Sequence, residues 1–596
     1  MNSRPLSIRT CFLLILFFGI AAYANTFTGV FHFDDILCIP ENRSLYPLNL
    51  GRLWHHSPLR FIANLSFAFN IYLAGFATWS FHILNLLIHI LASFVAFKLT
   101  RSILRTPAAK DLVPPSWQSL FALVVALLFV THPVQTEGVT YIVQRVTSLA
   151  ALLYLATLWM YLKARLENAR HYRVVFLLML AAMLTKEISI TLPFAILLSE
   201  LLLFPPSEKD PLSKKLLRWI PFAAFLLIIP VLYLTSPPLL MRMGESIKIH
   251  PAMIHGISRW NYLLTQFRVE RTYLRLLFFP VDQRLIYDYR LSSGWGDLDS
   301  WAAFSLLFSV LILALVFLKK NRLLTFGVLW LFLTLSVESS LIPLPDLIFE
   351  HRLYLPMFGF AIFLTSLLWM VSKSSKLFAA ISLSIIVVFS SMAHTRNEVW
   401  QSALSLFRDS VKKSPRMGIC YAGLADAYHD ELGDDRTAAI YYEKALKLGF
   451  VTPSVYRNLS WAYSRLGDQE KSLHFKKLIA SVSNRERNLL FLDSPALALA
   501  EKGPSLEVVE MLKKSIERSP ENPLLHIQLG EVYLKMYREN EAVLSFRQAI
   551  EADPLYTGGY NALALFYKQK GNEQKALDII KEYLRCKRIH KPLFGN

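Results

Sequence analysis

Eleven long apolar runs limit most strongly how this chain of 596 residues can fold. A helix rises about 1.5 Å per residue, so about 20 apolar residues cross the roughly 30 Å of hydrocarbon in a membrane. Because 54% of the residues are hydrophobic and 18% are charged, the chain is far more apolar than a soluble protein. The sequence therefore predicts an all-α, polytopic membrane protein with about eleven spans. The runs lie near residues 10–27, 80–100, 117–133, 146–163, 172–187, 188–204, 217–236, 300–318, 323–340, 353–371 and 376–393.

Basic residues orient these spans. The formal net charge is +19, and Lys and Arg concentrate in short loops between the apolar runs. With a cytoplasmic N-terminus every inside loop is basic, as the positive-inside rule requires, so the charge does not indicate nucleic-acid binding. An odd number of crossings then places the chain after residue 394 outside the cytoplasm. The inside loops contain Lys98, Arg101, Arg105, Lys110, Lys163, Arg165, Arg170, Arg173, Lys209, Lys214, Lys215, Arg218, Lys319, Lys320, Arg322, Lys373 and Lys376.

Two apolar segments need separate treatment. Residues 22–24 read Ala-Tyr-Ala, which is typical of a signal-peptidase site, so the first run is either a cleaved leader or a retained signal anchor. The segment 261–280 contains four charged side chains, Arg268, Glu270, Arg271 and Arg275. Each would cost about 2.5–3.5 kcal/mol at the centre of a bilayer. We therefore expect this segment to be an interfacial or re-entrant helix on the outer side.

The C-terminal third is a repeat array. Residues from Gly530 to Pro554 match the tetratricopeptide template of small, aromatic and proline residues, and Ala564, Tyr567 and Ala576 repeat the frame 34 residues later. Further copies lie near 400–415, 425–445, 460–467 and 496–520. We predict five repeats and a half-unit, forming an α-solenoid whose concave face binds a polypeptide. The predicted domains are 1–394 and 395–596.

Carboxylates, histidines and cations gather at the predicted outer ends of the spans. They come from five separate loops, and a site for an anionic, lipid-linked substrate needs all three types of group. They are Asp34, Asp35, Arg60, His82, His89, His132, Glu137, Arg145, Lys186, Glu187, Glu338, Glu350, His351 and Arg352.

The pair Asp34-Asp35 follows the first apolar run in "FHFDD". A carboxylate at this place can be the general base toward an acceptor hydroxyl, and its neighbour can orient it or bind a cation. Adjacent residues of an extended chain point to opposite sides, so we expect one base. The alternative for the motif alone is a solvated pair or a helix cap.

Histidines lie on two of the helix ends. His82 and His89 share one stripe of an apolar span, either as polar contacts between helices or in a catalytic or substrate-binding role. His132 and Glu137 lie where another span ends. Arg145, near the next helix start, is either a phosphate ligand or the partner of Glu137.

Two further clusters suit a phosphate group. Lys186-Glu187 interrupts an apolar stretch, where Lys186 can contact phosphate with Glu187 as its partner, or the two form a solvated ion pair at a hairpin tip. Glu350-His351-Arg352 ends a Pro-rich outer loop, and these groups suit the head group of a phosphate-linked sugar.

Together these stretches resemble the transmembrane O-mannosyltransferases with tetratricopeptide repeats. The matching motifs are "GVFHFDD", "GFATWSFHILNLLIH", "THPVQTEGVTYIVQR", "LTKEISIT", "YLRLLFFPVDQRLIYDY", "FEHRLYLP" and "RNEVW". Because the resemblance includes the junction of the first run with Asp34, it favours a retained anchor. The smaller number of repeats and the Glu-His-Arg triplet resemble bacterial members more than animal ones.

The resemblance implies a GT-C fold, in which a helical bundle binds a polyprenyl-phosphate sugar and an aspartate of the first outer loop deprotonates a protein hydroxyl. That aspartate corresponds to Asp34 or Asp35. Arg145, Lys186 and Arg352 would stabilise the departing phosphate, with Glu187 and His351 beside them and with His82, His89, His132, Glu137 and Glu350 in support. The implied location is a bacterial inner membrane with periplasmic repeats, or alternatively an endoplasmic reticulum membrane with lumenal repeats. No cofactor is certain and a divalent metal is compatible with the chemistry, while the donor sugar, with mannose as one candidate, stays open.

Three other functions remain to be distinguished. A glycan ligase would move an oligosaccharide from a diphosphate lipid. A non-enzymatic assembly platform would use the repeats alone and would tolerate loss of both aspartates. A transporter predicts polar residues at mid-membrane depth, whereas here they lie mostly at one face.

Overall fold

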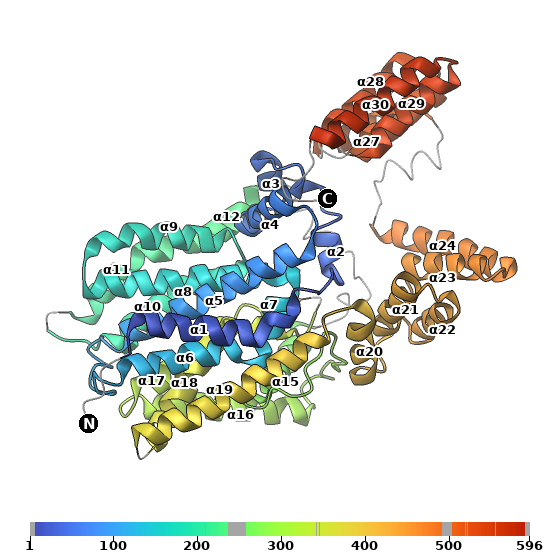
Figure 1. Cartoon of the computed structure of the whole chain (residues 1–596). Helices are drawn as coiled ribbons and strands as arrows, with labels where there is room; N and C mark the ends of the chain where they lie inside the picture. Colours follow the sequence, from blue (N-terminus) through green and yellow to red (C-terminus); the bar gives the residue numbers. More distant parts are fainter. Residues whose placement is uncertain are drawn as a thin grey trace.

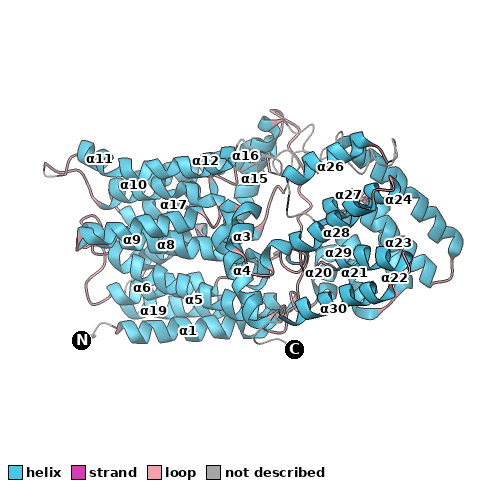
Figure 2. Cartoon of the chain, turned by 90° about the horizontal axis from the view of Figure 1, so that it is seen from above, coloured by secondary structure: helices cyan, strands magenta, loops and turns pink. Residues whose placement is uncertain are grey.

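The computed structural model describes residues 6–208, 210–235, 258–340, 343–344, 346–372, 374–490, 504–518, 520, 523–554 and 556–589. Throughout these ranges the chain is helical, with one isolated bridge between Ser207 and Asp210 and no strand. The apolar helices run side by side in a bundle, and the repeat helices extend from one end of it (Figures 1 and 2). The all-α prediction is confirmed for this part of the chain.

Each of the eleven apolar runs contains a helix. By length and composition six helices can cross a membrane, or seven if the bent pair Gln118–Thr131 and Pro133–Thr140 is one span. The other four runs hold helices of 12 to 16 residues, so the count of eleven spans stays a prediction. The helices are α1 (Ile8–Tyr23), α5 (Thr78–Ile103), α6 (Gln118–Thr131), α8 (Arg145–Leu166), α9 (Tyr172–Met183), α10 (Leu192–Leu203), α11 (Leu212–Ala223) with α12 (Ile228–Thr235), α16 (Leu298–Phe317), α17 (Arg322–Leu335), α18 (Pro356–Val371) and α19 (Ser375–Glu398).

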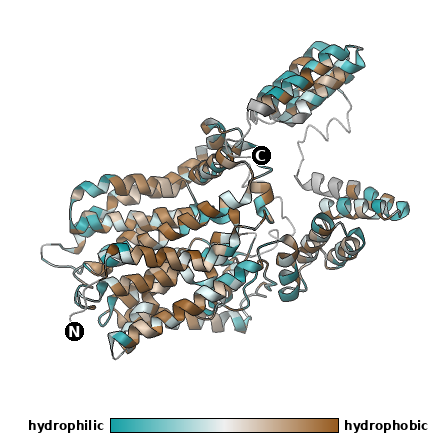
Figure 3. Ribbon diagram, in the orientation of Figure 1, coloured by the Kyte–Doolittle hydropathy of each residue, from teal (hydrophilic) through white to brown (hydrophobic). Residues whose placement is uncertain are grey.

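The two ends of the bundle differ in charge. At one end, which we call the basic end, Arg105 pairs with Glu167 at 2.6 Å, and the Arg322 guanidinium donates to the Leu202 carbonyl. The helix termini with the predicted inside loops meet at this end, apart from Lys209 and Lys373, which lie outside the described residues. The hydrophilic repeat helices leave from the opposite end, here called the site end (Figure 3). The bundle is therefore polarised as the positive-inside pattern predicts.

A second hydrophobic core closes the site end. The long segment after α1 folds into α2 (Asp34–Cys38), α3 (Leu50–His56) and α4 (Phe61–Ala74). Its apolar side chains pack in one cluster with residues of the first repeat helices, α20 (Ala403–Lys413) and α21 (Gly418–Leu432). This site-end core includes Leu45, Leu53, Phe67, Ile71, Tyr141, Ile142, Trp400, Leu406, Phe407 and Leu424. The predicted boundary between residues 394 and 395 falls inside α19, so it is shifted to the turn that follows Glu398.

The repeat array consists of helix pairs. In the pair around Gly530, a Cβ atom at that position would lie 2.5 Å from the Phe546 ring, so glycine allows the two helices to approach closely. The predicted copy around residue 496 lies partly outside the described residues. The further repeat helices are α22 (Asp435–Lys447), α23 (Pro453–Arg465), α24 (Gln469–Leu490), α26 (Leu506–Arg518), α27 (Pro523–Lys535), α28 (Glu539–Ala552), α29 (Thr557–Gln569) and α30 (Glu573–Ile589).

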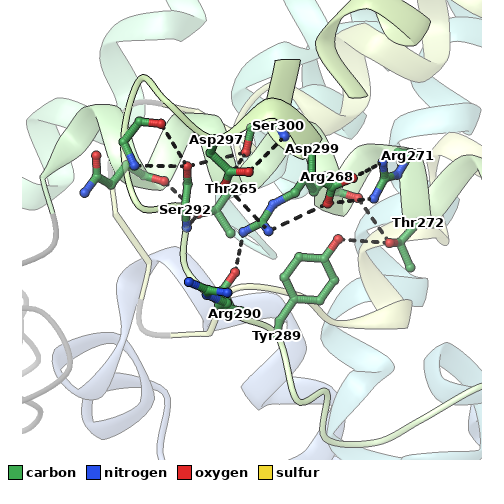
Figure 4. A network of polar contacts seen from close by, with 12 residues as sticks. Thr265, Arg268, Arg271, Thr272, Tyr289, Arg290, Ser292, Asp297, Asp299 and Ser300 are labelled. Carbon is green, nitrogen blue, oxygen red and sulfur yellow. Dashed lines mark hydrogen bonds and ion pairs between the residues drawn. The ribbon is translucent and has the colours of Figure 1, made fainter. Parts of the chain in front are cut away.

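Helix α15 (Arg259–Phe278) covers the charged segment 261–280 and is not among the helices able to cross a membrane. Its Arg268 is buried, donates to the Arg290 carbonyl and lies 3.7 Å from Asp297 (Figure 4). Arg271 forms a bidentate pair with Asp299 at the start of α16. These contacts pair two of the four charges of the segment, those of Arg268 and Arg271, with carboxylates beside the start of α16. The interfacial position of α15 stays a prediction.

Candidate functional site

Asp34 begins the short helix α2 after a strained backbone turn. Phe33 has a φ of 48°, which is uncommon for an aromatic residue and occurs where the surroundings over-determine the conformation. The backbone N–H of Asp34 donates to the Tyr141 hydroxyl at 2.9 Å, and the Asp34 side chain is partly exposed. The turn therefore presents one carboxylate at the site end with a fixed backbone.

Asp35 has different surroundings. Its side chain is fully buried, and its two oxygens accept the backbone N–H of Val143 at 2.6 Å and of His32 at 3.0 Å. It connects the turn to the start of α8. Of the two predicted catalytic carboxylates, Asp34 alone is accessible in this arrangement, and Asp35 fixes the loop.

Charged groups from three other segments surround Asp34. Burial raises the pKa of Asp34, the Tyr141 hydroxyl opposes this shift, Asp346 and Glu137 raise the pKa further, and Arg60 lowers it. A raised pKa makes a carboxylate a stronger base, as general-base catalysis requires.

Two cations from other segments converge on one carboxylate, that of Glu338. Lys186 Nζ lies 3.2 Å and Arg352 Nε 4.0 Å from the carboxylate oxygens of Glu338. Arg352 also donates to the carbonyls of Leu347 and Asp346, the residue that influences Asp34. The structure thus brings together the two predicted phosphate contacts from segments far apart in the sequence.

Glu187 does not pair with Lys186, which corrects the predicted partnership. Its carboxylate lies 3.6 Å from Arg60 Nε instead, and both side chains are partly exposed. Lys186 is nearly buried and also donates to the Thr147 hydroxyl at 3.0 Å. The alternative of a solvated Lys186–Glu187 pair at a hairpin tip is therefore wrong.

The three residues of the Glu350-His351-Arg352 triplet have different partners. His351 Nδ1 lies 2.9 Å from Glu137, whose second oxygen accepts the His351 backbone N–H. Burial, with Lys186 nearby, holds the pKa of His351 well below its usual range, so the ring is neutral. Glu350 is buried and accepts from Gln283, Arg284 and Tyr287, so it holds the segment 283–287 in place rather than facing a ligand.

Arg145 is not placed to bind phosphate. Its guanidinium is fully buried, and each of its three nitrogens donates to the protein, among them Nε to Asn85 at 2.6 Å and Nη2 to Asn70 at 2.9 Å. It also stacks on the Phe67 ring at 4.5 Å. Neither predicted alternative holds, because Arg145 faces neither the site nor Glu137. It joins α4, α5 and α8 instead.

The three predicted supporting histidines are buried among the helices. His89 contacts the Tyr354 hydroxyl at 2.6 Å and the Val130 carbonyl, and His132 donates to the Leu277 carbonyl of α15 at 2.9 Å. These are the interhelical contacts that the structural alternative predicts. His82 is 2% exposed and lies beside Gly29 in the turn before Asp34.

Two residues of this arrangement, Asp346 and Tyr141, were not singled out from the sequence. Arg60 and Glu338 carry charges on the predicted outer side, but no pattern showed that they pair with Glu187 and Lys186. Asp346 lies in the Pro-rich loop, and Tyr141 lies in an otherwise apolar motif. In the part of the chain that the structure describes, no group of three or more His, Cys, Asp or Glu side chains is arranged to hold a metal ion.

Comparison with known proteins agrees with the two-part architecture. A family model described as a tetratricopeptide repeat matches residues 525–554. Protein O-mannosyl-transferase TMTC4 of Homo sapiens is 26% identical over 484 residues, covering 71% of this chain and 64% of the relative. Protein O-mannosyl-transferase TMTC3 of Homo sapiens is 22% identical and covers 89% of this chain and 63% of the relative. The predicted resemblance is confirmed.

Tmtc3 of Drosophila melanogaster, also named a protein O-mannosyl-transferase, is 25% identical over 518 residues, covering 73% of this chain and 55% of the relative. The chain thus spans less than two thirds of the length of these protein O-mannosyl-transferases. Among solved structures, MamA is 15% identical over 33% of this chain and 94% of its own, with a TM-score of 0.16. YrrB, titled a TPR protein with an unusual peptide-binding site, is 17% identical over 30% of this chain and 91% of its own, with a TM-score of 0.19.

Proposed function

We propose that this chain is a GT-C type glycosyltransferase that transfers one sugar from a polyprenyl-phosphate donor to a hydroxyl group of a protein. The observation that carries the proposal is a chain of contacts. Asp34 is a partly exposed carboxylate on a strained turn and is influenced by Asp346. The Asp346 carbonyl accepts from Arg352, which shares the counter-ion Glu338 with Lys186. The names of the relatives support transfer to protein, and mannose is the first sugar to test.

The reaction is a single displacement. The oxygen of the acceptor hydroxyl attacks the anomeric carbon of the donor, and Asp34 takes the proton of that hydroxyl. The bond from that carbon to the phosphate oxygen breaks, and its electron pair leaves with the lipid phosphate. Lys186 and Arg352 stabilise the charge that develops on that phosphate, and the anomeric centre inverts.

The site end faces away from the cytoplasm in this proposal. The supporting observation is that the basic loops gather at the other end of the bundle. The repeats then lie in the periplasm of a bacterium, or in the endoplasmic reticulum lumen as the alternative, and dock the acceptor protein beside the site. The side of the membrane that the site end faces can be tested with a membrane-impermeant thiol reagent, because Cys38 is exposed on α2 at the site end.

The decisive experiment uses the full chain in lipid nanodiscs with a labelled polyprenyl-phosphate hexose and a hydroxyl-rich acceptor peptide. We expect Asp34→Asn to lower turnover by about 10²- to 10⁴-fold, the usual contribution of a general base, while donor binding is kept. Glu41→Gln is the matched control, because this exposed carboxylate lies on the same segment.

Each other outcome selects an alternative. Turnover that survives Asp34→Asn removes the assigned base. Transfer of an oligosaccharide from a diphosphate lipid indicates a glycan ligase. No transfer from any lipid-linked donor, together with retained binding of a protein by the repeats, indicates an assembly platform.

A further inference from the structure

The turn that carries Asp34 is held from the repeat side as well as from the bundle. The ring of Tyr141 packs on the Trp400 ring, with centroids 5.2 Å apart, and both side chains are almost fully buried. The Trp400 carbonyl accepts a hydrogen bond from the His32 ring at 2.8 Å. Residues 32 and 34 are thus fixed by Trp400 and Tyr141, which touch each other.

Trp400 belongs to the connection between α19 and the first repeat helix. Ser402 caps α20, and Arg396 at the end of α19 pairs with Asp409 of α20 at 2.7 Å. Helix α20 is also bonded to the bundle, since Lys413 Nζ donates to the Gln283 carbonyl and the Ser414 hydroxyl to the Ile286 carbonyl, each at 2.7 Å. A displacement of α20 would therefore move Trp400, and with it the two residues that hold the turn.

We propose that Tyr141 is a positioning residue for the Asp34 carboxylate, and that Trp400 links this position to the first repeat helix. The inference rests on the proposed function, because it assigns a role within the same site. Tyr141 touches neither substrate in this role and acts through Asp34. Its hydroxyl accepts the Asp34 backbone N–H, and the aromatic contact with Trp400 keeps that hydroxyl in place.

The groups that face Asp34 determine how its pKa responds to loss of the Tyr141 hydroxyl. Burial raises the pKa of Asp34, and the Tyr141 hydroxyl is the first group that opposes it, while Asp346, Glu137 and Asp35 add negative charge and Arg60 adds positive charge. Removing the hydroxyl takes a stabilising donor from the carboxylate, so its pKa moves upward. The backbone N–H of Asp34 also loses its acceptor, which leaves the turn less firmly held.

The test compares Tyr141→Phe with Tyr154→Phe in the full chain. The two variants are matched, because Tyr154 is also fully buried in the bundle and its hydroxyl also forms a hydrogen bond, with Thr191 at 3.0 Å. Carbodiimide labelling of Asp34, read by peptide mass spectrometry from about pH 4 to about pH 9, reports the ionisation of the carboxylate without any substrate. A third variant, Trp400→Phe, keeps an aromatic ring and tests the link to α20, with the exposed Trp461→Phe as its control.

We expect the labelling midpoint of Asp34 to move to higher pH in Tyr141→Phe and to stay unchanged in Tyr154→Phe. The kcat of Tyr141→Phe should fall about tenfold with an unchanged donor KM, because the less firmly held turn no longer fixes the carboxylate at the acceptor hydroxyl. Trp400→Phe should shift both readouts in the same direction, and Trp461→Phe neither. An unchanged midpoint in Tyr141→Phe overturns the inference, as does an equal shift in both tyrosine variants. If the midpoint shifts in Tyr141→Phe but the wild-type chain transfers no sugar, the result contradicts the proposed function instead, so the two failures are distinct.

Discussion

Asp34 and Asp35 show how neighbouring, chemically identical residues acquire different properties from what surrounds them. Asp34 stays partly exposed and close to charges from other segments, whereas Asp35 is enclosed and accepts two backbone N–H groups. Burial raises the pKa of Asp35 to about 8, although these two hydrogen bonds favour its ionised form. A carboxylate used in this way contributes to folding of the loop, and its neighbour is left for chemistry.

His32 makes the same loop sensitive to acid. Burial lowers the pKa of His32 to about 4 from the ordinary 6.5, against the opposing effect of its bond to Trp400. Between about pH 6.5 and about pH 4 the unfolded chain binds a proton at this ring and the native chain does not, so stability falls as the pH falls. The full shift corresponds to about 3 kcal/mol. We expect the apparent melting temperature of His32→Gln to fall less than that of the wild type between about pH 6.5 and about pH 4.

The exposed His55→Gln is the control for this measurement. If the melting temperatures of wild type and His32→Gln fall equally from neutral to acid pH, His32 is not the source of the acid response. In that case the acid response must come from other groups.

The sequence singled out these residues but not the partners that the structure gives them. The aspartate pair, Lys186 and Arg352 were recognised by residue type and by their place beside apolar runs. Arg145 looked equally suitable, but its donors are used inside the bundle, because Asn70 and Asn85 on two other helices point at it. Contacts of this kind join residues more than 50 positions apart, and no local pattern contains them.

At the scale of elements, two glycines determine how closely the last spans pack. A Cβ atom at Gly327 of α17 would lie 2.5 Å from the Gly359 carbonyl oxygen of α18, and one at Gly359 would lie 2.6 Å from the Gly327 carbonyl oxygen. Small residues at a crossing allow backbones to approach, which is the main source of helix association in lipid. Helix α18 follows directly on His351 and Arg352, so this crossing helps to hold the segment that carries these two residues.

Gly327→Ala should lower the stability of the chain by about 1–3 kcal/mol, the usual effect of overpacking, because the new methyl group meets backbone atoms that cannot move aside. The measurement is the apparent melting temperature in detergent. Gly296→Ala is the control, since a Cβ atom there meets no atom within 4 Å. Equal melting temperatures for both variants would show that α17 and α18 separate easily.

The elements themselves follow from apolar runs and turn signals, which are local. Helices appear in all eleven runs, and the charged segment 261–280 forms α15 outside the candidate spans, as the positions of its four charges predict. Helix lengths were less predictable, because η7 (Glu187–Thr191) and the bend after α6 shorten regular helices at the site. The bend after α6 falls at Pro133, a local signal, because proline cannot continue a helix. The break at η7 follows Lys186, whose contacts with Thr147 and Glu338 come from other segments.

For the whole molecule, the division into cores differs from the division into sequence regions. The first repeat helices share the site-end core with the loops that carry Asp34, while α26 to α30 form a hydrophobic cluster of their own. The sequence pattern changes from membrane to repeat near residue 394, but packing does not. The repeat periodicity predicts which helices pair, but it does not predict which part of the membrane domain the first pair packs against.

A truncation series separates the two parts of the array. A chain ending at residue 490 keeps the site-end core, so it should fold and glycosylate a short hydroxyl peptide at the wild-type rate. Its turnover of a folded acceptor protein should fall about tenfold or more, because the second contact that raises local acceptor concentration is lost. The assay is label transfer to both acceptors.

A chain ending at residue 398 lacks Trp400, Leu406 and Phe407 and should not yield a monodisperse protein, because the core at the site end is then open to water. A stable and active protein of this length would show that the first repeat helices are dispensable to the membrane domain.

The shared core also decides where recombination can be tolerated. A protein engineer who wishes to redirect the proposed transfer to a new target would leave the chain untouched through α21 and graft foreign repeats only beyond it. Exchange of repeats with a relative would meet the same restriction, because the segment that touches Tyr141 and His32 belongs to the site-end core.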